Sequence, residues 1–502
     1  MKRALYFLFS LLIIFNIFVT FWLPINGDIF YNQDSARDFL LLEEIIEREP
    51  FTLIGPRTLG ISGIFHGPLW LYINVPVYIL GGGNPAVIGV FWGMLFSLSV
   101  VVLWYVAKKL FDKLTAFLST LLYSSIFASP LHNFNNTFGA VVIFPFYFYI
   151  FNLYINTLKV RYLILSFLLV GLIIQFQMAF GIPILILQVG FLLYFLMRKK
   201  LLKHFMALPI LFIPLSTFIL FELRHQFLQT QSFLTYITSR QAETFNFLSV
   251  QTFFSRVSLI FKDSIGQISG REIIISIFVI LLFIFGYKKI FSQRKNSKKN
   301  FYLLFLYLYI GYWVITYFYT GQIWIWYHWA FAPVMVIIFS SLYRYINKWM
   351  FFVVFVLCFG LVMKGQIQTF FRVQKEFSGK DHYSWVLFLN GAKNMYEESG
   401  QDFGYYIFED DMLGYRGRYA INYAEKFYRN QGNSNTKKPV TYLFVASAHD
   451  YRWWKKTQVK IDRKPNSVTH LSYPYRIERY DLNIRELSLP SDPNLIDTLH
   501  FR

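Results

Sequence analysis

Apolar residues in this chain form long unbroken blocks instead of the regular spacing that marks one face of a soluble helix or strand. Charged side chains are absent from six blocks, which are residues 69–107, 114–158, 162–197, 205–221, 273–286 and 301–343. A transmembrane helix needs about 20 consecutive apolar residues. The blocks are long enough for one or two helices each, except 273–286, which needs its flanking residues. The pattern therefore predicts an α-helical polytopic membrane protein.

The charges between these blocks predict how the chain is threaded through the membrane. The formal net charge is +20, and nineteen basic residues against the single acid Asp112 lie in short clusters between the blocks. Lys and Arg accumulate in cytoplasmic loops of membrane proteins, so this placement indicates membrane topology and not a nucleic-acid groove. If every basic cluster lies in the cytoplasm, the chain is a multi-pass protein of the cell (plasma) membrane. Its amino terminus is then cytoplasmic and its carboxy terminus extracytoplasmic.

This trace has about eleven spans. They are residues 5–23, 86–107, 114–129, 138–157, 162–178, 181–197, 204–221, 273–287, 301–319, 327–343 and 349–364. Residues 24–85, 130–137, 222–272 and a tail from about 365 then lie outside. The first span begins with basic residues like a signal peptide, but no small-residue cleavage site follows it. We therefore interpret it as a retained anchor.

The first outside loop, 24–85, predicts two helices that lie along the membrane. Residues 69–80 are too few to cross it, and glycines 81–83 predict a turn before the second span. The earlier helix has an apolar face and an acidic face. The apolar face carries Phe39, Leu42, Ile45 and Ile46, and the opposite face carries Glu43, Glu44, Glu47 and Arg48.

Asp34 stands apart from this acidic face. It follows Gln33, and Arg37 and Asp38 come one helical turn later, where residues three and four positions apart are neighbours. One interpretation is an N-cap of the helix. The other is a carboxylate held at the outer membrane surface as a general base. The two are compatible, and both stay open.

Three motifs in this loop resemble the first outside loop of the GT-C glycosyltransferases, the superfamily of protein O-mannosyltransferases and lipid A aminoarabinose transferases. They are QDSARD at 33–38, GPRTLGISGIFHGPLWLY at 55–72 and GGGNP at 81–85. Two later motifs, FELRHQF at 221–227 and WIWYHWAFAP at 324–333, also fit. The resemblance implies a membrane domain over 1–365 that transfers a sugar from a polyprenyl-phosphate donor to an extracytoplasmic acceptor hydroxyl, usually with inversion. Asp34 matches the acid of the family and is our predicted base.

A departing lipid phosphate needs cations or hydrogen-bond donors at the outer interface. The candidates are Arg57, His66, Arg224, His225, Tyr327 and His328. Arginine suits phosphate because its planar fork binds two oxygens. Lipid-headgroup contacts and an aromatic belt are the alternative roles for these residues.

The sequence also departs from the family. Ser35 follows Asp34 where relatives carry Glu, and the next outside loop offers no second acid. It provides only His132, Asn133, Asn135 and Asn136. Hard divalent cations prefer several carboxylate oxygens, so metal use is in doubt, and Asp34 with Asp38 is the one pair left for it. No cofactor is assigned.

The tail, 366–502, turns polar and predicts a small soluble α/β domain. A helix is expected at 384–397 and strands at 403–410 and 440–447. This domain binds the acceptor or covers the active site. HDYRWW at 449–454 contacts sugar or, as aromatic residues more often do, packs in a core. The lone Cys358 permits no intramolecular disulfide and is expected to pack within the last span.

Two other functions stay open. A transporter or flippase of lipid-linked sugars suits many spans and outer-leaflet basic residues, although such proteins tend to carry charged or broken helices at mid-membrane and the span cores here are nearly free of ionisable groups. A scaffold or polymerase of surface polysaccharide fits the first loop less well.

Overall fold

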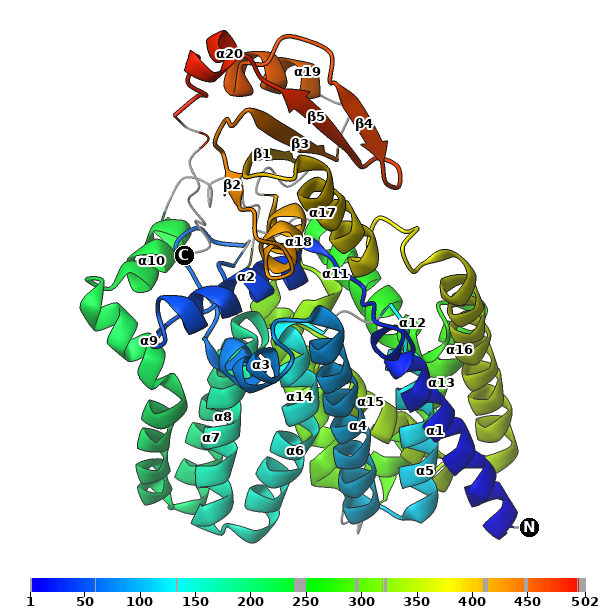
Figure 1. The fold of residues 1–502 in the computed structure, drawn as a ribbon. Coiled ribbons are helices and arrows are strands. Elements are labelled where there is room, and N and C mark those ends of the chain that lie inside the picture. Colours follow the sequence, from blue (N-terminus) through cyan, green and yellow to red (C-terminus); the bar gives the residue numbers. More distant parts are fainter. Residues whose placement is uncertain are drawn as a thin grey trace.

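The computed structural model describes residues 2–58, 60–131, 134–238, 250–293, 298–317, 319, 323–409, 414–446, 450–493 and 495. A bundle of helices forms the lower part of the molecule, and a smaller unit built on a β-sheet lies above it (Figure 1). Helix α2 lies between the two. His132, Asn133 and His449 fall outside the described residues.

The long helices of the bundle follow the apolar blocks. They are α1 (Lys2–Ile25), α4 (Pro85–Leu110), α5 (Lys113–Phe127), α6 (Asn136–Thr157), α7 (Val160–Phe176), α8 (Met178–Lys199), α13 (Ile273–Ser292), α14 (Lys299–Thr316), α15 (Phe331–Ser341) and α16 (Lys348–Glu376). The predicted span 204–221 is a 3₁₀ segment, η1 (Leu202–Leu211), followed by α9 (Phe212–Arg224). Every predicted span therefore coincides with helical structure.

Among the described residues, seven helical segments are long and apolar enough to cross a membrane, and four shorter apolar helices accompany them. The expectation of a multi-pass membrane protein is confirmed. The count of eleven crossings stays a prediction. Short helices follow α9 on the upper side of the bundle. They are α10 (Leu228–Thr238), α11 (Val250–Leu259), the π-helical η3 (Ile260–Ile265) and α12 (Gly266–Ile268).

The first loop forms α2 (Gln33–Glu47) and α3 (Leu69–Leu80), as expected. The N-cap of α2 is Asn32, whose side chain accepts a hydrogen bond from the Ser35 amide, so the N-cap interpretation of Asp34 is wrong. Asp34 instead lies in the first turn, where its charge favours the positive end of the helix. The predicted two-faced pattern also fails in part: Leu40 and Leu41 are buried, whereas Ile46 is 40% exposed.

The upper unit contains a mixed five-stranded sheet in the order β2-β1-β3-β5-β4. Its strands are β1 (Phe403–Phe408), β2 (Gly432–Ser434), β3 (Val440–Val445), β4 (Ser467–His470) and β5 (Arg476–Asp481). Strand β1 runs parallel to β2 and β3, and β5 runs antiparallel to β3 and β4. Its helices are α17 (Trp385–Ser399), α18 (Tyr415–Glu425), α19 (Tyr451–Trp454) and α20 (Ile484–Ser488). The predicted α/β tail, with its first helix and two strands, is confirmed.

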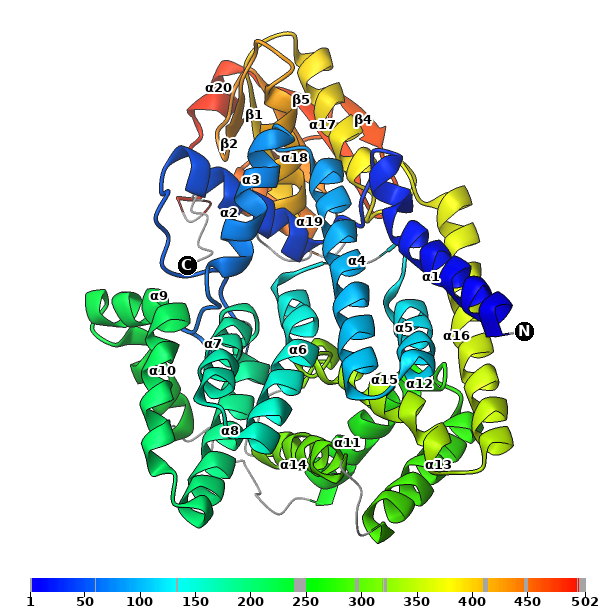
Figure 2. The same cartoon turned by 90° about the horizontal axis from the view of Figure 1, so that it is seen from below.

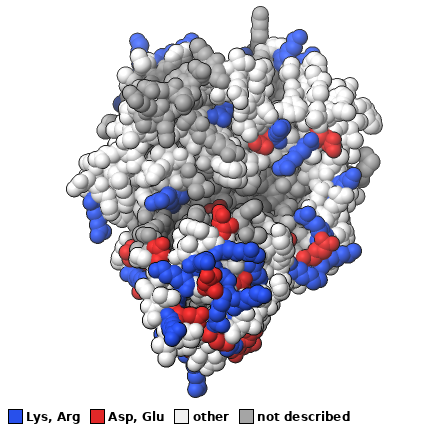
Figure 3. Space-filling view, turned by 90° about the horizontal axis from the view of Figure 1, so that it is seen from above, with Lys and Arg blue, Asp and Glu red and all other residues white. Residues whose placement is uncertain are grey.

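Charged side chains gather on the outer surface of this unit, and aromatic residues pack against its sheet. Seen from above, Lys, Arg, Asp and Glu gather over it, whereas the described surface beside it is mostly uncharged (Figure 3). On one side of the sheet, Tyr451 and Trp454 lie in a small hydrophobic core, so these aromatics of the HDYRWW motif pack as the core alternative expected. Cys358 is buried in α16, which also agrees with expectation.

The upper unit is joined to the bundle by buried contacts. The Tyr31 hydroxyl donates to the Arg416 carbonyl at 3.0 Å, and the Ser384 hydroxyl donates to the Asp28 carboxylate at 2.7 Å. Burial raises the pKa of Asp28, and its hydrogen bond from Ser384 opposes that effect. One continuous hydrophobic core includes residues of α2, α4, α17 and α18. Helix α16 also continues past residue 365, and a domain boundary there stays a prediction.

Candidate active site

The first turn of α2 carries an ion-paired cluster of three side chains. Arg37 Nη1 lies 2.7 Å from Asp34 Oδ1, and Arg37 Nη2 lies 2.8 Å from Asp38 Oδ1. The pairing of Arg37 with Asp34 at i, i+3 confirms the contact expected from their spacing. The Asp34 side chain is 45% exposed, whereas that of Asp38 is 5% exposed. The turn therefore presents one carboxylate to its surroundings and buries the other.

Asp38 anchors this cluster in the protein. Its Oδ1 accepts from Arg37 Nε at 3.0 Å as well, and its Oδ2 accepts from the Trp70 indole at 3.1 Å. Burial raises the pKa of Asp38, and the positive charge of Arg37 opposes this. Burial also disfavours the charge on Arg37, but Asp38 and Asp34 outweigh it and raise the pKa of Arg37. A permanently charged guanidinium thus holds Asp34 in one orientation.

The same contacts bear on the metal expected from the Asp34 and Asp38 pair. Both oxygens of Asp38 and one oxygen of Asp34 already accept hydrogen bonds from Arg37 or Trp70. A divalent cation needs several free oxygen ligands and would lie beside the guanidinium charge. Within the described part of the chain, no group of three or more His, Cys, Asp or Glu residues could hold a metal ion. The residues present do not fit a metal at this place.

His66 lies at the base of a hairpin within the first loop and close to the cluster. The hairpin pairs Gly55 N with the His66 carbonyl at 2.7 Å and His66 N with the Pro56 carbonyl at 3.0 Å. Burial and, to a smaller extent, the charge of Arg37 lower the pKa of His66 to about 4, and Asp34 opposes this shift. His66 is therefore neutral at neutral pH. It can donate or accept a hydrogen bond near Asp34, but it does not provide the cation expected for a phosphate.

Tyr327 is the last residue of the short η4 helix (Ile325–Tyr327), and His328 follows it shortly before α15. A Cβ placed on Gly60 would lie 3.8 Å from the Tyr327 hydroxyl, so the tip of the first-loop hairpin reaches this tyrosine. His328 is 2% exposed and packs against the Trp313 ring at 5.1 Å. Both of its ring nitrogens are buried without a hydrogen-bond partner. Its burial favours a packing role over direct contact with a substrate.

The remaining predicted cations do not join the Asp34 cluster. Arg57 is exposed on the hairpin, where its backbone pairs with Phe65. Arg224 and His225 are exposed at the end of α9, and the His225 ring stacks on Phe221 at 4.1 Å. Helices α9 and α10 lie on one side of the molecule, and α1 and α16 lie on the opposite side, in both ribbon views (Figure 2).

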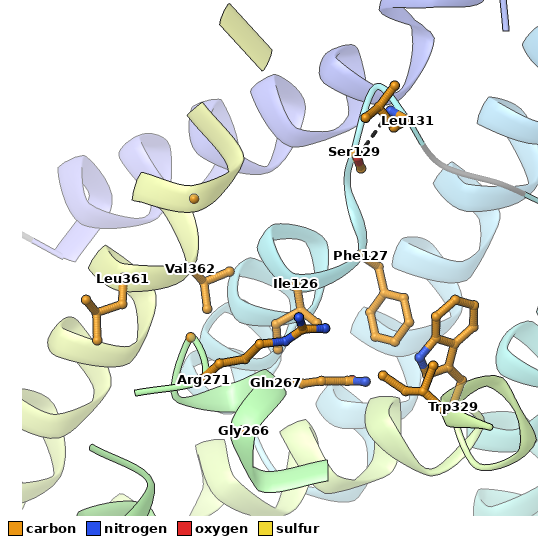
Figure 4. A pocket seen from close by; sticks show the side chains of 13 residues that line it. Ile126, Phe127, Ser129, Leu131, Gly266, Gln267, Arg271, Trp329, Leu361 and Val362 are labelled. Atoms are coloured by element: carbon orange, nitrogen blue, oxygen red, sulfur yellow. Dashed lines mark hydrogen bonds between the residues drawn. The ribbon is translucent and has the colours of Figure 1, made fainter. Parts of the chain in front are cut away.

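A cavity of about 410 Å³ opens on the side of α16, and Arg271 extends across it (Figure 4). The Gln267 side chain lies beside Arg271 and points towards Trp329. The remaining lining side chains are mainly apolar. They come from the end of α5 and the loop after it, from η4 and the segment between η4 and α15, and from the second half of α16, and include Ile126, Phe127, Leu131, Ile325, Trp329, Leu361 and Val362. The cavity therefore combines one guanidinium with apolar walls.

The backbone at this cavity is held in an uncommon conformation. Gly270 and Arg271 both have positive φ, at 64° and 67°, and the Arg271 amide donates to the Gly266 carbonyl at 2.6 Å. A left-handed conformation costs a non-glycine residue about 1–2 kcal/mol, and such outliers cluster at functional sites. Leu131 of the cavity belongs to the same hydrophobic cluster as Phe30, which lies just before α2. Leu131 and Phe30 thus pack against the same buried side chains, Leu23, Val373 and Phe377.

Arg271 and Gln267 were missed by the sequence analysis. Both lie in the outside loop 222–272, and an outer-surface cation was the criterion already applied to Arg224. Arg256 of α11 meets the same criterion, and its guanidinium donates to the Tyr319 carbonyl at 2.9 Å. The criterion alone could not rank these arginines, because the loop lacks an apolar block that fixes their position.

Comparison with solved structures shows that the chain shares the fold of ArnT. The chain is similar to ArnT from Cupriavidus metallidurans in the apo state, with a TM-score of 0.59 and 10% identity over 94% of this chain and 97% of that chain. For ArnT bound to undecaprenyl phosphate the TM-score is 0.62, with the same identity and coverage. An oligosaccharyltransferase from Archaeoglobus fulgidus matches with a TM-score of 0.48 and 11% identity over 86% of this chain and 68% of that chain.

No protein-family model matches the sequence, and no curated protein matches it. The similarity to ArnT confirms the fold that the first-loop motifs led us to expect.

Proposed function

We propose that this protein is a membrane glycosyltransferase that moves a sugar from a polyprenyl-phosphate donor to a hydroxyl group of an extracytoplasmic acceptor. The observation that carries the proposal is the Asp34 carboxylate, which is exposed yet held by Arg37 in the first turn of α2. The ArnT fold supports the donor class, because ArnT has been solved with undecaprenyl phosphate bound.

In the proposed reaction, Asp34 takes the proton of the acceptor hydroxyl. The acceptor oxygen forms a bond to the anomeric carbon of the sugar while the bond from that carbon to the phosphate oxygen breaks. Polyprenyl phosphate leaves with the electron pair, and the sugar is transferred with inversion. General-base catalysis of this kind contributes about 100- to 10,000-fold to a rate. Arg37 positions the base, and the buried Asp38 fixes Arg37.

The cavity at Arg271 is the best candidate for the donor phosphate and the first isoprenyl units. A guanidinium offers paired hydrogen bonds to phosphate oxygens, and the apolar walls suit the lipid. The strained backbone at Arg271 and the hydrophobic cluster that Leu131 shares with Phe30 support this assignment. Arg57, Arg224, His225, Tyr327 and His328 stay as second-rank candidates, because none of them lines this cavity.

This reaction requires a defined orientation in the membrane. We place the amino terminus in the cytoplasm and the α/β unit outside, in agreement with the basic loops between the spans. The transporter or flippase alternative predicts a different accumulation of substrate, so one experiment separates the two functions.

The experiment is mass spectrometry of lipid-linked sugars and surface glycans in cells that carry wild-type protein, Asp34→Asn protein or none. The proposal predicts that one sugar disappears from a surface glycan, lipid or protein in both mutant strains, while its lipid-linked form accumulates in the outer leaflet. Accumulation on the cytoplasmic side would support the flippase instead. Normal glycans in the Asp34→Asn strain would exclude Asp34 as the base.

A further inference from the structure

Helix α18 of the upper unit lies along α2 in a defined register. The rings of Phe39 and Tyr419 are 5.2 Å apart, and Asn422 donates to Glu43 at 2.9 Å. Both pairs advance in the same chain direction. Tyr415 precedes Tyr419 by one turn of α18. Asp34 and Arg37 lie in the part of α2 that precedes Phe39 by about one turn. Tyr415 therefore lies beside that turn.

Electrostatic contact supports this placement, because Tyr415 acts on the charge of Arg37. The first turn of α18 is also firmly held. The Arg416 guanidinium donates to Glu409 at 3.4 Å and to the Tyr475 hydroxyl, while the Arg416 carbonyl accepts from Tyr31. Before it, Gly414 has φ +63°, and a Cβ there would come within 2.7 Å of Ile407. Tyr415, which is 9% exposed, is thus held in a fixed place at the start of α18.

The direction from which the acceptor attacks indicates a role for Tyr415. In an inverting displacement, the acceptor oxygen approaches the anomeric carbon from the side opposite the leaving phosphate. The proposed donor cavity is lined by helices of the bundle, and α2 lies at the top of that bundle (Figure 1). The acceptor must then reach Asp34 from the aqueous side, where α18 lies over α2 (Figure 1).

We propose that Tyr415 contacts the acceptor, so that the α/β unit supplies one wall of the acceptor-binding site. This inference rests on the proposed function and assigns the acceptor-facing side of its site. A tyrosine ring can pack on the C–H face of a carbohydrate, and its hydroxyl can hydrogen-bond to acceptor oxygens. The acceptor class that suits this wall is a hydroxyl-bearing glycan that enters from water.

The test measures transfer to an envelope extract from cells that lack the protein, with a synthetic polyprenyl-phosphate hexose as donor. Extract and donor are titrated separately. Tyr415→Ala should raise the half-saturating amount of extract at least tenfold, while the half-saturating donor concentration and the rate at saturation change less than twofold. Tyr415→Phe should shift the extract requirement in the same direction by a smaller factor. Tyr423→Ala, on the same helix two turns later, is the matched control.

An unchanged extract requirement in Tyr415→Ala, or a change confined to the donor requirement, would overturn the inference. If Tyr415→Ala does not fold, Tyr415→Phe becomes the test. The inference is then overturned if Tyr415→Phe needs the same amount of extract for half-saturation as the wild-type protein. If Asp34→Asn is inactive and the Tyr415 variants behave like the wild-type protein, only this inference is rejected. An active Asp34→Asn variant would reject the proposed function itself.

Discussion

Replacement of Arg37 by Met tests whether the ion-paired cluster holds the first turn of α2 together. Arg37 supplies three hydrogen bonds to the two carboxylates, at 2.7, 2.8 and 3.0 Å. In Arg37→Met the buried Asp38 carboxylate keeps only the Trp70 indole as a donor. Removing one partner of a buried ion pair typically costs about 3–5 kcal/mol, because an uncompensated charge stays behind.

The double variant Arg37→Met/Asp38→Asn separates charge from architecture. A neutral amide at residue 38 can still accept from Trp70 and no longer buries an unpaired charge, so the double variant should recover most of the lost stability. It should not recover activity, because Asp34 still lacks the guanidinium that orients it. Arg48→Met, an exposed change at the end of the same helix, should stay within about 0.5 kcal/mol of wild type.

The assay is chemical unfolding of the purified protein in detergent micelles, with sugar transfer measured on the same samples. Two results would refute the reasoning. One is an Arg37→Met variant as stable as wild type, which would mean that the cluster contributes little to folding. The other is a double variant no more stable than the single one, which would mean that the buried charge of Asp38 is not the cause.

Three further predictions address other parts of the site. Gly67→Ala should destabilise the protein by about 1–3 kcal/mol in the same unfolding assay, because the added Cβ would lie 1.9 Å from Gln175 Oε1. Wild-type stability of this variant would show that the hairpin does not pack tightly against Gln175. The melting temperature should fall as the pH drops from about 6.5 towards 4, because His66 takes up a proton in the unfolded chain but stays neutral in the folded protein, where its pKa is about 4. The variant His66→Gln should weaken this pH dependence. An unchanged pH profile in His66→Gln would contradict the burial of a neutral imidazole. Arg271→Ala should raise the half-saturating donor concentration at least tenfold, because charge-assisted hydrogen bonds to the phosphate are lost. Arg224→Ala should change that concentration less than twofold. A larger effect of Arg224→Ala than of Arg271→Ala would place the phosphate at α9.

The sequence predicted those features that depend on local pattern. Apolar blocks of sufficient length placed a helix at every expected span, and alternation in the tail located β1 and β3. The i, i+3 spacing of Asp34 and Arg37 predicted their contact because a helix of known pitch brings such residues together.

Features that depend on contacts between distant segments could not be predicted in this way. The acidic face of α2 was expected to face water, but α18 packs there, and Asn422 binds Glu43 across 379 positions of the chain. The cavity at Arg271 joins α5, the segment after α12 and α16, none of which are neighbours in sequence. The cap at Asn32 shows a local limit as well, because several polar residues before a helix compete for one capping position.

The most direct test of the central claim is turnover by the purified protein in lipid vesicles that contain a synthetic polyprenyl-phosphate hexose, with envelope extract as the acceptor source. Asp34→Asn is compared with wild type and with Arg48→Met, after the unfolding assay has shown that all three are folded. We predict that Asp34→Asn loses at least about 100-fold in transfer rate while donor saturation stays close to that of wild type. Transfer by Asp34→Asn at the wild-type rate would contradict the account.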